Sequence, residues 1–322
     1  MSATIRDIAR AAGVSTGTVS RALKDQRGLS DATRQHVRDV ARTLGYDLDR
    51  LRDAPVQRIA CVLHRQHGSL AERPLQAQLL QGIEDACQRA GAVPTLLTVQ
   101  TADTVFRLAQ RHAPDRLLVA GYLPPDLLDA LDRLDRPMVL ADLRAPGRAS
   151  VNAEDTEGGR RATRHLADAG RRRIACVAEA LPHPGTRARQ LGYRRALYEA
   201  GLPADPDLDL AGSGQAADVA MRRLLRRPQR PDAVFACDDL SALAALQVCL
   251  EAGLRVPHDI ALVGFGDIAA AVLAPVPLTT LRVDGELLGR QAVELLLQTP
   301  QTTDTLEIPV TLVTRASTAD AA

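Results

Sequence analysis

The sequence predicts an all-α head, a three-helix helix-turn-helix unit, followed by a two-lobed α/β domain with doubly wound parallel sheets. The first 46 residues contain three short amphipathic stretches separated by polar caps and glycines. From Arg58 onward, short apolar runs alternate with amphipathic helical stretches, which is the pattern of parallel α/β sheets. The 322 residues exceed the ~100 to 200 of a common domain, so we expect a small module beside a larger, divided one.

The three helices of the head are marked by their N-caps, which are Thr4, Ser15 and Ser30. Gly13 can adopt the positive φ that a tight turn between the first two helices demands, and Gly45 stops the third. The side chains expected to face inward are Ile5, Ile8, Ala9, Val19, Ala22, Leu23, Val37, Val40, Ala41 and Leu44. A small residue, a glycine and a branched residue at positions 9, 13 and 19 indicate a helix-turn-helix.

The second helix is expected to expose short hydroxyls and one guanidinium, carried by Thr16, Gly17, Thr18, Ser20 and Arg21. Such groups suit phosphate oxygens and base edges, and arginine can donate two hydrogen bonds to guanine. Arg21 is therefore the expected base reader, with Thr16 and Gly17 approaching base edges at the start of the helix. The unit could instead be a protein-docking bundle, but this face has few bulky apolar residues to hold a protein partner.

The formal net charge of +1 hides an asymmetry along the chain. Residues 1–46 carry eight Lys or Arg against four Asp, a net charge of +4, which leaves −3 for the rest. A basic head on a slightly acidic body suits a phosphate-binding module attached to a domain that does not touch DNA. A solvated, arginine-rich surface is the alternative interpretation.

A family resemblance rests on the runs TIRDIARAAGVSTGTVSRAL from Thr4, SDATR from Ser30 and LGY from Leu44. They resemble the head of the LacI/GalR family of bacterial repressors. The resemblance implies base readers at Thr16, Gly17 and Arg21 and phosphate anchors at Thr4, Ser15, Thr18 and Ser20. Lys24 completes the basic part of the predicted DNA-binding set. Gly17 replaces a longer side chain that is frequent in the family, so readout there is expected to be weak or to rest on DNA shape.

The linker, residues 47–57, departs from the family's pattern, in which a hinge helix wedges a leucine into the minor groove. Leu48 stands where the family has proline, and Pro55 falls at the leucine's distance from Tyr46. Counted back from the first strand, Leu51 takes the leucine's place and is the predicted wedge. A plain flexible tether is the alternative, favoured by carboxylates that phosphates repel, namely Asp47, Asp49 and Asp53.

The body is expected to contain strands at residues 58–63, 116–120, 137–141, 173–178, 233–237 and 260–264, and helices at 79–90, 159–169, 187–200 and 240–252. Several segments, such as LQGIEDA from Leu80 and RQLGYRRAL from Arg189, resemble the same family and the periplasmic sugar-binding proteins. The resemblance implies a periplasmic-binding-protein-like domain at 58–322, with lobes joined by crossovers near Asn152, Leu281 and Ile308. The N-lobe then covers about 58–152 and 282–307, and the C-lobe about 153–281 and 308–322.

The resemblance also implies a homodimer and a small-molecule effector in the cleft between the lobes, where the strands' carboxyl ends would hold it. Arg189 and Asp238 are expected to face this cleft and to suit vicinal hydroxyls or a carboxylate. Alternatively, Arg189 is a surface residue paired with an acid, and Asp238 only caps a helix. The family usually has an acidic effector contact where Gly266 stands. With 2% aromatic residues and no obvious aromatic side chain near the cleft, stacking is poorly supplied, so the effector is unusual or absent.

Other function classes find little support. The isolated pairs Gly212-Ser-Gly214 and Gly264-Phe-Gly266 lack the G-x-G-x-x-G pattern, and His64 and His67 lack partners at metal-ligand spacing. No catalytic residue, cofactor or metal site is therefore predicted. The five cysteines, without a C-x-x-C pair, are expected to be buried thiols. Charge near the N-terminus argues against an exported binding protein, and no apolar stretch approaches the ~18 residues of a membrane helix, so we expect a cytoplasmic protein with no membrane partner.

These observations predict a regulator, expected to be a repressor, that binds a near-palindromic double-stranded DNA operator as a dimer. A sugar, a sugar phosphate or another polar metabolite would modulate it. The alternative is a cytoplasmic small-molecule-binding protein whose head binds DNA weakly or independently of an effector.

Overall fold

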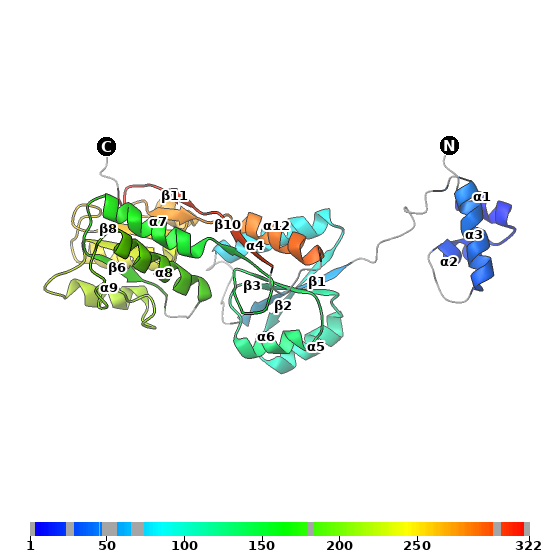
Figure 1. Ribbon diagram of the computed structural model, residues 1–322, viewed down its shortest axis with the longest axis horizontal. Helices are drawn as coiled ribbons and strands as arrows, with labels where there is room; N and C mark the ends of the chain where they lie inside the picture. Colours follow the sequence, from blue (N-terminus) through cyan, green and yellow to red (C-terminus); the bar gives the residue numbers. More distant parts are fainter. Residues whose placement is uncertain are drawn as a thin grey trace. The chain divides into compact units, whose positions relative to one another are not determined.

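The computed structural model describes residues 4–23, 29–44, 46, 57–65, 74–179, 183–298 and 304–318. The chain divides into two compact units, Met1–Gln57 and Arg58–Ala322, and Figure 1 shows the elements of each. Nine residues named above lie outside the described residues, namely Lys24, Gly45, Asp47, Leu48, Asp49, Leu51, Asp53, Pro55 and His67.

The head consists of α1 (Ile5–Ala12), α2 (Thr16–Leu23) and α3 (Asp31–Thr43). Thr4 caps α1 in a reciprocal arrangement, because its hydroxyl accepts from the Asp7 backbone while the Asp7 carboxylate accepts from the Thr4 N–H at 2.9 Å. The Asp7 carboxylate also accepts from the Thr4 hydroxyl at 2.6 Å, and this bond, together with that from the Thr4 N–H, holds the pKa of Asp7 below its usual range. Ser15 and Ser30 accept from the backbone N–H three residues on, at 3.0 and 3.2 Å. The three predicted caps are confirmed.

The core of the head lies where the three helices meet. Gly13 has φ 65°, so the predicted left-handed turn after α1 is confirmed. The buried side chains are Ile8, Ala9, Ala12, Val19, Ala22, Leu23, Val37 and Ala41. Leu44 is 39% exposed, so the prediction that it faces inward is wrong. The reason is that α3 ends at Thr43, which leaves Leu44 in the cap rather than on the helix's inner face.

The first sheet of the body is parallel throughout and has the order β10-β5-β4-β3-β1-β2. Its strands are β1 (Arg58–His64), β2 (Val93–Val99), β3 (Arg116–Ala120), β4 (Met138–Ala141), β5 (Ser150–Ala153) and β10 (Thr305–Ile308). Alternate residues of β1 face opposite cores. Helices α4 (Pro74–Arg89) and α12 (Gly285–Leu297) cover one face, and α5 (Ala102–His112) and α6 (Pro125–Asp132) cover the other (Figure 1). We call this sheet and the helices that cover it the N-lobe.

The second sheet has the order β11-β9-β8-β7-β6. Its strands are β6 (Ile174–Val177), β7 (Ala233–Ala236), β8 (Ala261–Gly266), β9 (Thr279–Arg282) and β11 (Thr311–Val313). The first four are parallel, whereas the edge strand β11 runs antiparallel to β9. Helices α7 (Asp155–Asp168) and α8 (Pro184–Glu199) pack on one face, and α9 (Ala217–Leu225) and α10 (Asp239–Glu251) on the other, with the short α11 (Ala269–Leu273) after β8. We call this sheet and its helices the C-lobe.

The chain passes between the two lobes three times: after β5, after β9 and between β10 and β11. All six predicted strands and all four predicted helices of the body are present, and the doubly wound fold is confirmed. Each of these helices begins earlier than predicted. The first turn of the helix contains polar residues or proline, such as Asp155 in α7 and Pro184 in α8, and the apolar pattern used for the prediction starts only after it. All five cysteines are buried, as predicted.

Within each lobe, one pair of helices touches backbone to backbone. A Cβ at Gly159 or Gly192 would overlap a carbonyl oxygen across the α7–α8 contact, and the same holds for Gly82 and Gly289 across the α4–α12 contact. Figure 1 shows both pairs side by side. These four glycines therefore fix the closest helix packing in the body.

Candidate functional site

The outer face of α2 is polar and accessible. Thr16, Gly17 and Arg21 are exposed, whereas Val19, Ala22 and Leu23 of the same helix are buried. The Arg21 guanidinium makes one long hydrogen bond, from Nε to the Gly17 carbonyl at 3.4 Å. Its terminal nitrogens are thus available for an external acceptor. The predicted anchors Thr4 and Ser15 are exposed, and Thr18 and Ser20 are partly so.

A cavity of about 140 Å³ lies between the lobes of the body and is large enough for several water molecules or a small ligand. The N-lobe supplies Pro74, Leu75, Gln76, Tyr122 and Asp142 to its wall. The C-lobe supplies Glu179, His183, Thr186, Arg189, Asp238, Asp239, Leu240, Phe265, Gly266 and Ile268. Many of these residues follow the carboxyl ends of β3, β4, β6, β7 and β8, where an open α/β sheet is expected to bind ligands.

Arg189 forms part of the cavity wall and is 6% exposed. Its Nε donates to Asp155 Oδ1 at 2.9 Å, and Nη1 donates to the Cys237 carbonyl at 2.8 Å. The guanidinium lies 3.9 Å from the centre of the Phe265 ring, which adds a cation–π contact. Burial opposes the charge of Arg189, but the neighbouring carboxylates, Asp155 first, raise its pKa. The alternative that Arg189 is a surface residue is therefore wrong, although it does pair with an acid.

Asp238 lines the cavity and also caps α10. Its two carboxylate oxygens accept from the backbone N–H and the hydroxyl of Ser241, both at 2.7 Å. The next residue, Asp239, was not predicted and is 1% exposed. It accepts from the Thr280 hydroxyl at 2.6 Å and from the Ile268 N–H at 2.9 Å, while burial raises its pKa. The pair ties the start of α10 to β9 and to the turn after β8.

Gly266 lines the cavity with a backbone that only glycine adopts readily, at φ 137°. A Cβ there would stand 3.3 Å from an Asp239 carboxylate oxygen. The acid that follows, Asp267, is instead paired with Arg282 at 2.6 Å and with Arg315 at 2.5 Å. These hydrogen bonds outweigh burial and lower its pKa. Asp239 thus places a carboxylate beside position 266.

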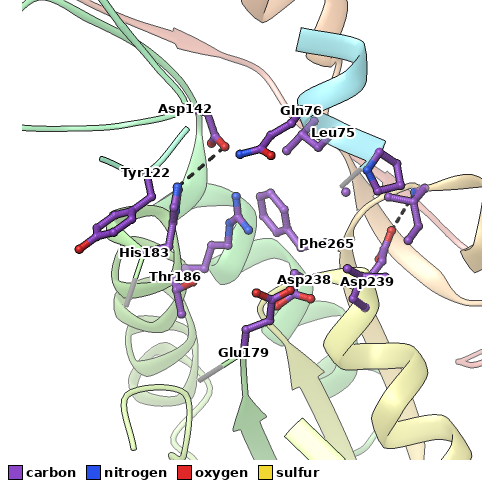
Figure 2. A pocket seen from close by; sticks show the side chains of 15 residues that line it. Leu75, Gln76, Tyr122, Asp142, Glu179, His183, Thr186, Asp238, Asp239 and Phe265 are labelled. Carbon is purple, nitrogen blue, oxygen red and sulfur yellow. Dashed lines mark hydrogen bonds and ion pairs between the residues drawn. The ribbon is translucent and has the colours of Figure 1, made fainter. Parts of the chain in front are cut away.

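The N-lobe wall and its surroundings contain polar groups that sequence reasoning missed. Asp142 is 9% exposed, and its Oδ2 lies 3.9 Å from His183 Nε2. Burial raises the pKa of Asp142 against the opposing effect of the positive charges of His183 and Arg189. Gln76 is 6% exposed, and its Oε1 has no hydrogen-bond partner. Figure 2 shows both side chains at the cavity.

Aromatic side chains are present at the cavity, contrary to the sequence prediction. Phe265 and Tyr122 both line it, as Figure 2 shows, and the Phe265 ring lies against the Arg189 guanidinium. Tyr122 was missed because it lies beyond the end of β3, in a segment that no pattern had linked to the cleft. Phe265 adjoins Gly266, which was predicted to lie at the cleft, so its position in the sequence could have indicated it. Across the described ranges, no three His, Cys, Asp or Glu side chains stand close enough to hold a metal ion. In the same part of the chain, no helix is both long and apolar enough to span a membrane.

Comparison with known proteins agrees with this architecture. Residues 4–48 match the lacI family of bacterial regulatory proteins, and residues 163–318 match a periplasmic binding protein-like domain. An HTH-type transcriptional repressor PurR from Aliivibrio salmonicida is 31% identical over 311 residues, which cover 92% of each chain. The chain belongs to the LacI family.

Other LacI-family regulators match most of the chain. The HTH-type transcriptional regulator CelR of Thermobifida fusca is 34% identical over 321 residues, 95% of this chain and 94% of that protein. A solved complex of the transcriptional regulator CelR with cellobiose superposes with a TM-score of 0.72 at 31% identity, covering 98% and 99% of the two chains. A LacI-family regulator from Enterococcus faecium with bound ribose gives 0.68 at 25% identity, covering 83% and 100%.

The family assignment makes this LacI-family chain a transcriptional regulator and not an enzyme. Arg189, Asp238 and Gly266, far apart in the sequence, line one cavity. Thr16, Gly17 and Arg21 share the exposed face of α2.

Proposed function

We propose that two protomers bind a near-palindromic double-stranded operator and that a small effector in the cleft alters this binding, as expected of a repressor. The observation that carries the proposal is α2, which buries its apolar residues and presents Thr16, Gly17 and Arg21 outward. In a dimer, two such helices would enter successive major grooves about 34 Å apart.

Base readout is assigned to Arg21, with Thr16 and Gly17 at the start of the helix. The accessible guanidinium suits two hydrogen bonds to one guanine, which discriminates by roughly 1 to 3 kcal/mol. Gly17 offers no side chain, so its contribution rests on close approach to the DNA. Phosphate contacts are assigned to Thr4, Ser15, Thr18 and Ser20, while Lys24 and Leu51 stay predictions.

Dimer formation is supported by apolar side chains that the described protomer leaves exposed. Val93 and Leu96 of the edge strand β2 are 49% and 51% exposed, and Leu273 of α11 is 83% exposed. Exposed apolar groups on an edge strand favour contact with another chain. A second copy of the protein would cover them, and sedimentation of the full chain measures its mass directly.

An effector role for the cleft is supported by its lining from both lobes and by the sugars bound in two similar regulators. A ligand that contacts both walls binds the closed arrangement more tightly than the open one. It therefore shifts the lobes toward closure, and this coupling changes the affinity of the heads for DNA.

The test is a titration of the full-length protein against a library of fluorescent DNA duplexes at fixed salt, repeated with candidate metabolites. We expect Arg21→Ala to relax selectivity at one base pair in each half-site, whereas Ser15→Ala should weaken all sequences to a similar degree. Selectivity unchanged in Arg21→Ala would refute the readout assignment. Selective binding that no metabolite shifts would favour a head that works without an effector.

A further inference from the structure

The described lining of the cavity contains more acidic than basic side chains. Its acidic side chains are Asp142, Glu179, Asp238 and Asp239. Arg189 contributes one permanent positive charge, and His183 adds one only when protonated. Arg189 pairs at 2.9 Å with Asp155, which is not part of the lining, so its charge is already partly balanced. A phosphate or carboxylate ligand would therefore find few cationic partners in this lining, whereas a cationic ligand would find several acidic side chains.

Hydrogen bonding at the N-lobe wall calls for donors from a ligand. Asp142 is 9% exposed, and its contact with His183, at 3.9 Å, is too long for a hydrogen bond. Gln76 is 6% exposed, and its Oε1 lacks a donor. Both groups reach the same cavity (Figure 2). Since buried acceptors are normally satisfied, a ligand here should bring N–H or O–H groups.

The acidic side chains and their positions around the cavity indicate which kind of hydrogen-bond donor a ligand should carry. Figure 2 shows Asp142 on one side of the cavity and Glu179 and Asp238 on the other. Among the described residues, no three His, Cys, Asp or Glu side chains are grouped as metal ligands, so an organic donor fits this lining better than a metal ion. Hydroxyl groups alone would supply donors but no charge. An ammonium group supplies up to three donors and a positive charge.

We propose that the effector is an amine-bearing polyol, such as an amino sugar, whose ammonium group binds Asp142 and Gln76. Its hydroxyl groups face Asp238 and Arg189 on the opposite wall. This inference rests on the proposed effector role of the cleft. It predicts that positive charge, placed between carboxylates of the two lobes, draws the lobes together.

The experiment compares matched ligands on the full-length protein by isothermal titration calorimetry. The probes are glucose, glucosamine, N-acetylglucosamine and glucose 6-phosphate, with the corresponding galactose and mannose series. In at least one series, the amine should bind ten-fold or more tightly than its neutral and acetylated forms, and the phosphate should not bind. The preference should shrink as salt is raised. Tighter binding of a phosphate or neutral member, or failure of every amine to bind, would overturn the proposal.

Two variants locate the recognition of the ammonium group. Asp142→Asn keeps the size of the side chain and should reduce the amine preference about ten-fold while changing affinity for the neutral sugar less than three-fold. Asp238→Asn retains a residue able to cap α10 and should weaken the amine less. The control is Asp168→Asn, an exposed carboxylate paired with Arg164 on α7, which should change nothing.

A full amine preference retained in well-folded Asp142→Asn would overturn its assignment. If that variant does not fold, the salt dependence and Asp238→Asn decide: a salt-independent preference that Asp238→Asn leaves intact would contradict the proposal. Operator binding measured on the same samples distinguishes a failure of this inference from a failure of the proposed function. Selective operator binding without any amine response refutes this inference alone, and loss of both refutes the proposed function.

Discussion

The outer face of α2 and the interlobe cavity are both polar surfaces on apolar scaffolds, but their side chains are held differently. Arg21 is exposed and makes one long contact with its own helix. Arg189 is buried and tied to Asp155, to the Cys237 carbonyl and to the Phe265 ring. The first arginine is thus ordered mainly when it binds, whereas the second is ordered by folding. Substitutions should separate the two surfaces, with binding affected in the head and stability affected in the body.

The largest expected effect is that of Arg189→Ala on the stability of the body. Removing one partner of a buried ion pair leaves the other uncompensated and costs about 3 to 5 kcal/mol. Arg21→Ala should change the free energy of unfolding by about 0.5 kcal/mol or less. Urea denaturation of the full chain, followed by far-UV circular dichroism, measures both. Equal changes in the free energy of unfolding in the two variants would contradict the proposed difference between the two surfaces.

A matched pair of glycines gives the next largest difference. Gly192→Ala forces α7 and α8 apart, because the new methyl group would overlap the Thr156 carbonyl oxygen, and should cost at least about 1 to 3 kcal/mol. At Gly17 the nearest atom to such a methyl group is the Ser15 hydroxyl at 3.8 Å. Gly17→Ala should therefore stabilise the head by up to about 1 kcal/mol through helix propensity. Thermal melts should show shifts of opposite sign, and a neutral Gly192→Ala would argue against the close packing.

Helix caps should act alike in both regions but with different consequences. Ser30→Ala and Thr101→Ala each remove a hydroxyl that accepts from the backbone three residues on, which costs about 1 kcal/mol. In the small head this loss should lower operator affinity, whereas in the body it should lower only the unfolding midpoint. Hydrogen exchange and operator titration check the two outcomes. Operator affinity reduced as much by Thr101→Ala would contradict this separation.

The smallest expected effect is a loss of stability in weak acid that is confined to the body. Burial lowers the pKa of His165 below its ordinary value of about 6.5, while His36 in the head is exposed. The unfolded chain therefore binds a proton first as the pH falls. The stabilisation from neutral His165 is fully present above pH about 6.5 and is lost between that pH and the lower pKa of the folded state. Unfolding measured from pH 8 to 5 should show this loss, reduced in His165→Gln.

Sequence patterns predicted the head well because its signals are local. Each cap and Gly13 act within a few residues of their own position. Among the described side chains of the head that were expected to face inward, Leu44, at a helix end, is exposed. In the body, the predicted strands are those with continuous apolar runs. β2 was missed because it contains Pro94 and exposes much of its length, and β5 because Ser-Val-Asn-Ala contains too few apolar residues.

The cavity was predicted only in part because its walls are assembled from both lobes. Resemblance supplied Arg189, Asp238 and Gly266, all of which line it. Nothing near Gln76 or His183 in the sequence marks them as neighbours of one cavity. Asp142 and Glu179 are different, since each directly follows a predicted strand. In a parallel sheet that position alone is reason to expect a side chain at the ligand-binding edge.

The glycine contacts between paired helices also set the mechanics of the lobes. Where the backbones of two helices touch, no intervening side chains can rearrange to let one helix move past the other. We therefore expect α4 and α12 to move as one rigid unit, and α7 and α8 as another. Helix α4 starts at the cavity with Leu75 and Gln76 and runs for 16 residues, or about 24 Å. A turn of about 10° at its cavity end would displace its far end by about 4 Å over that length. A motion too small to disturb either core would thus be amplified across the width of a lobe.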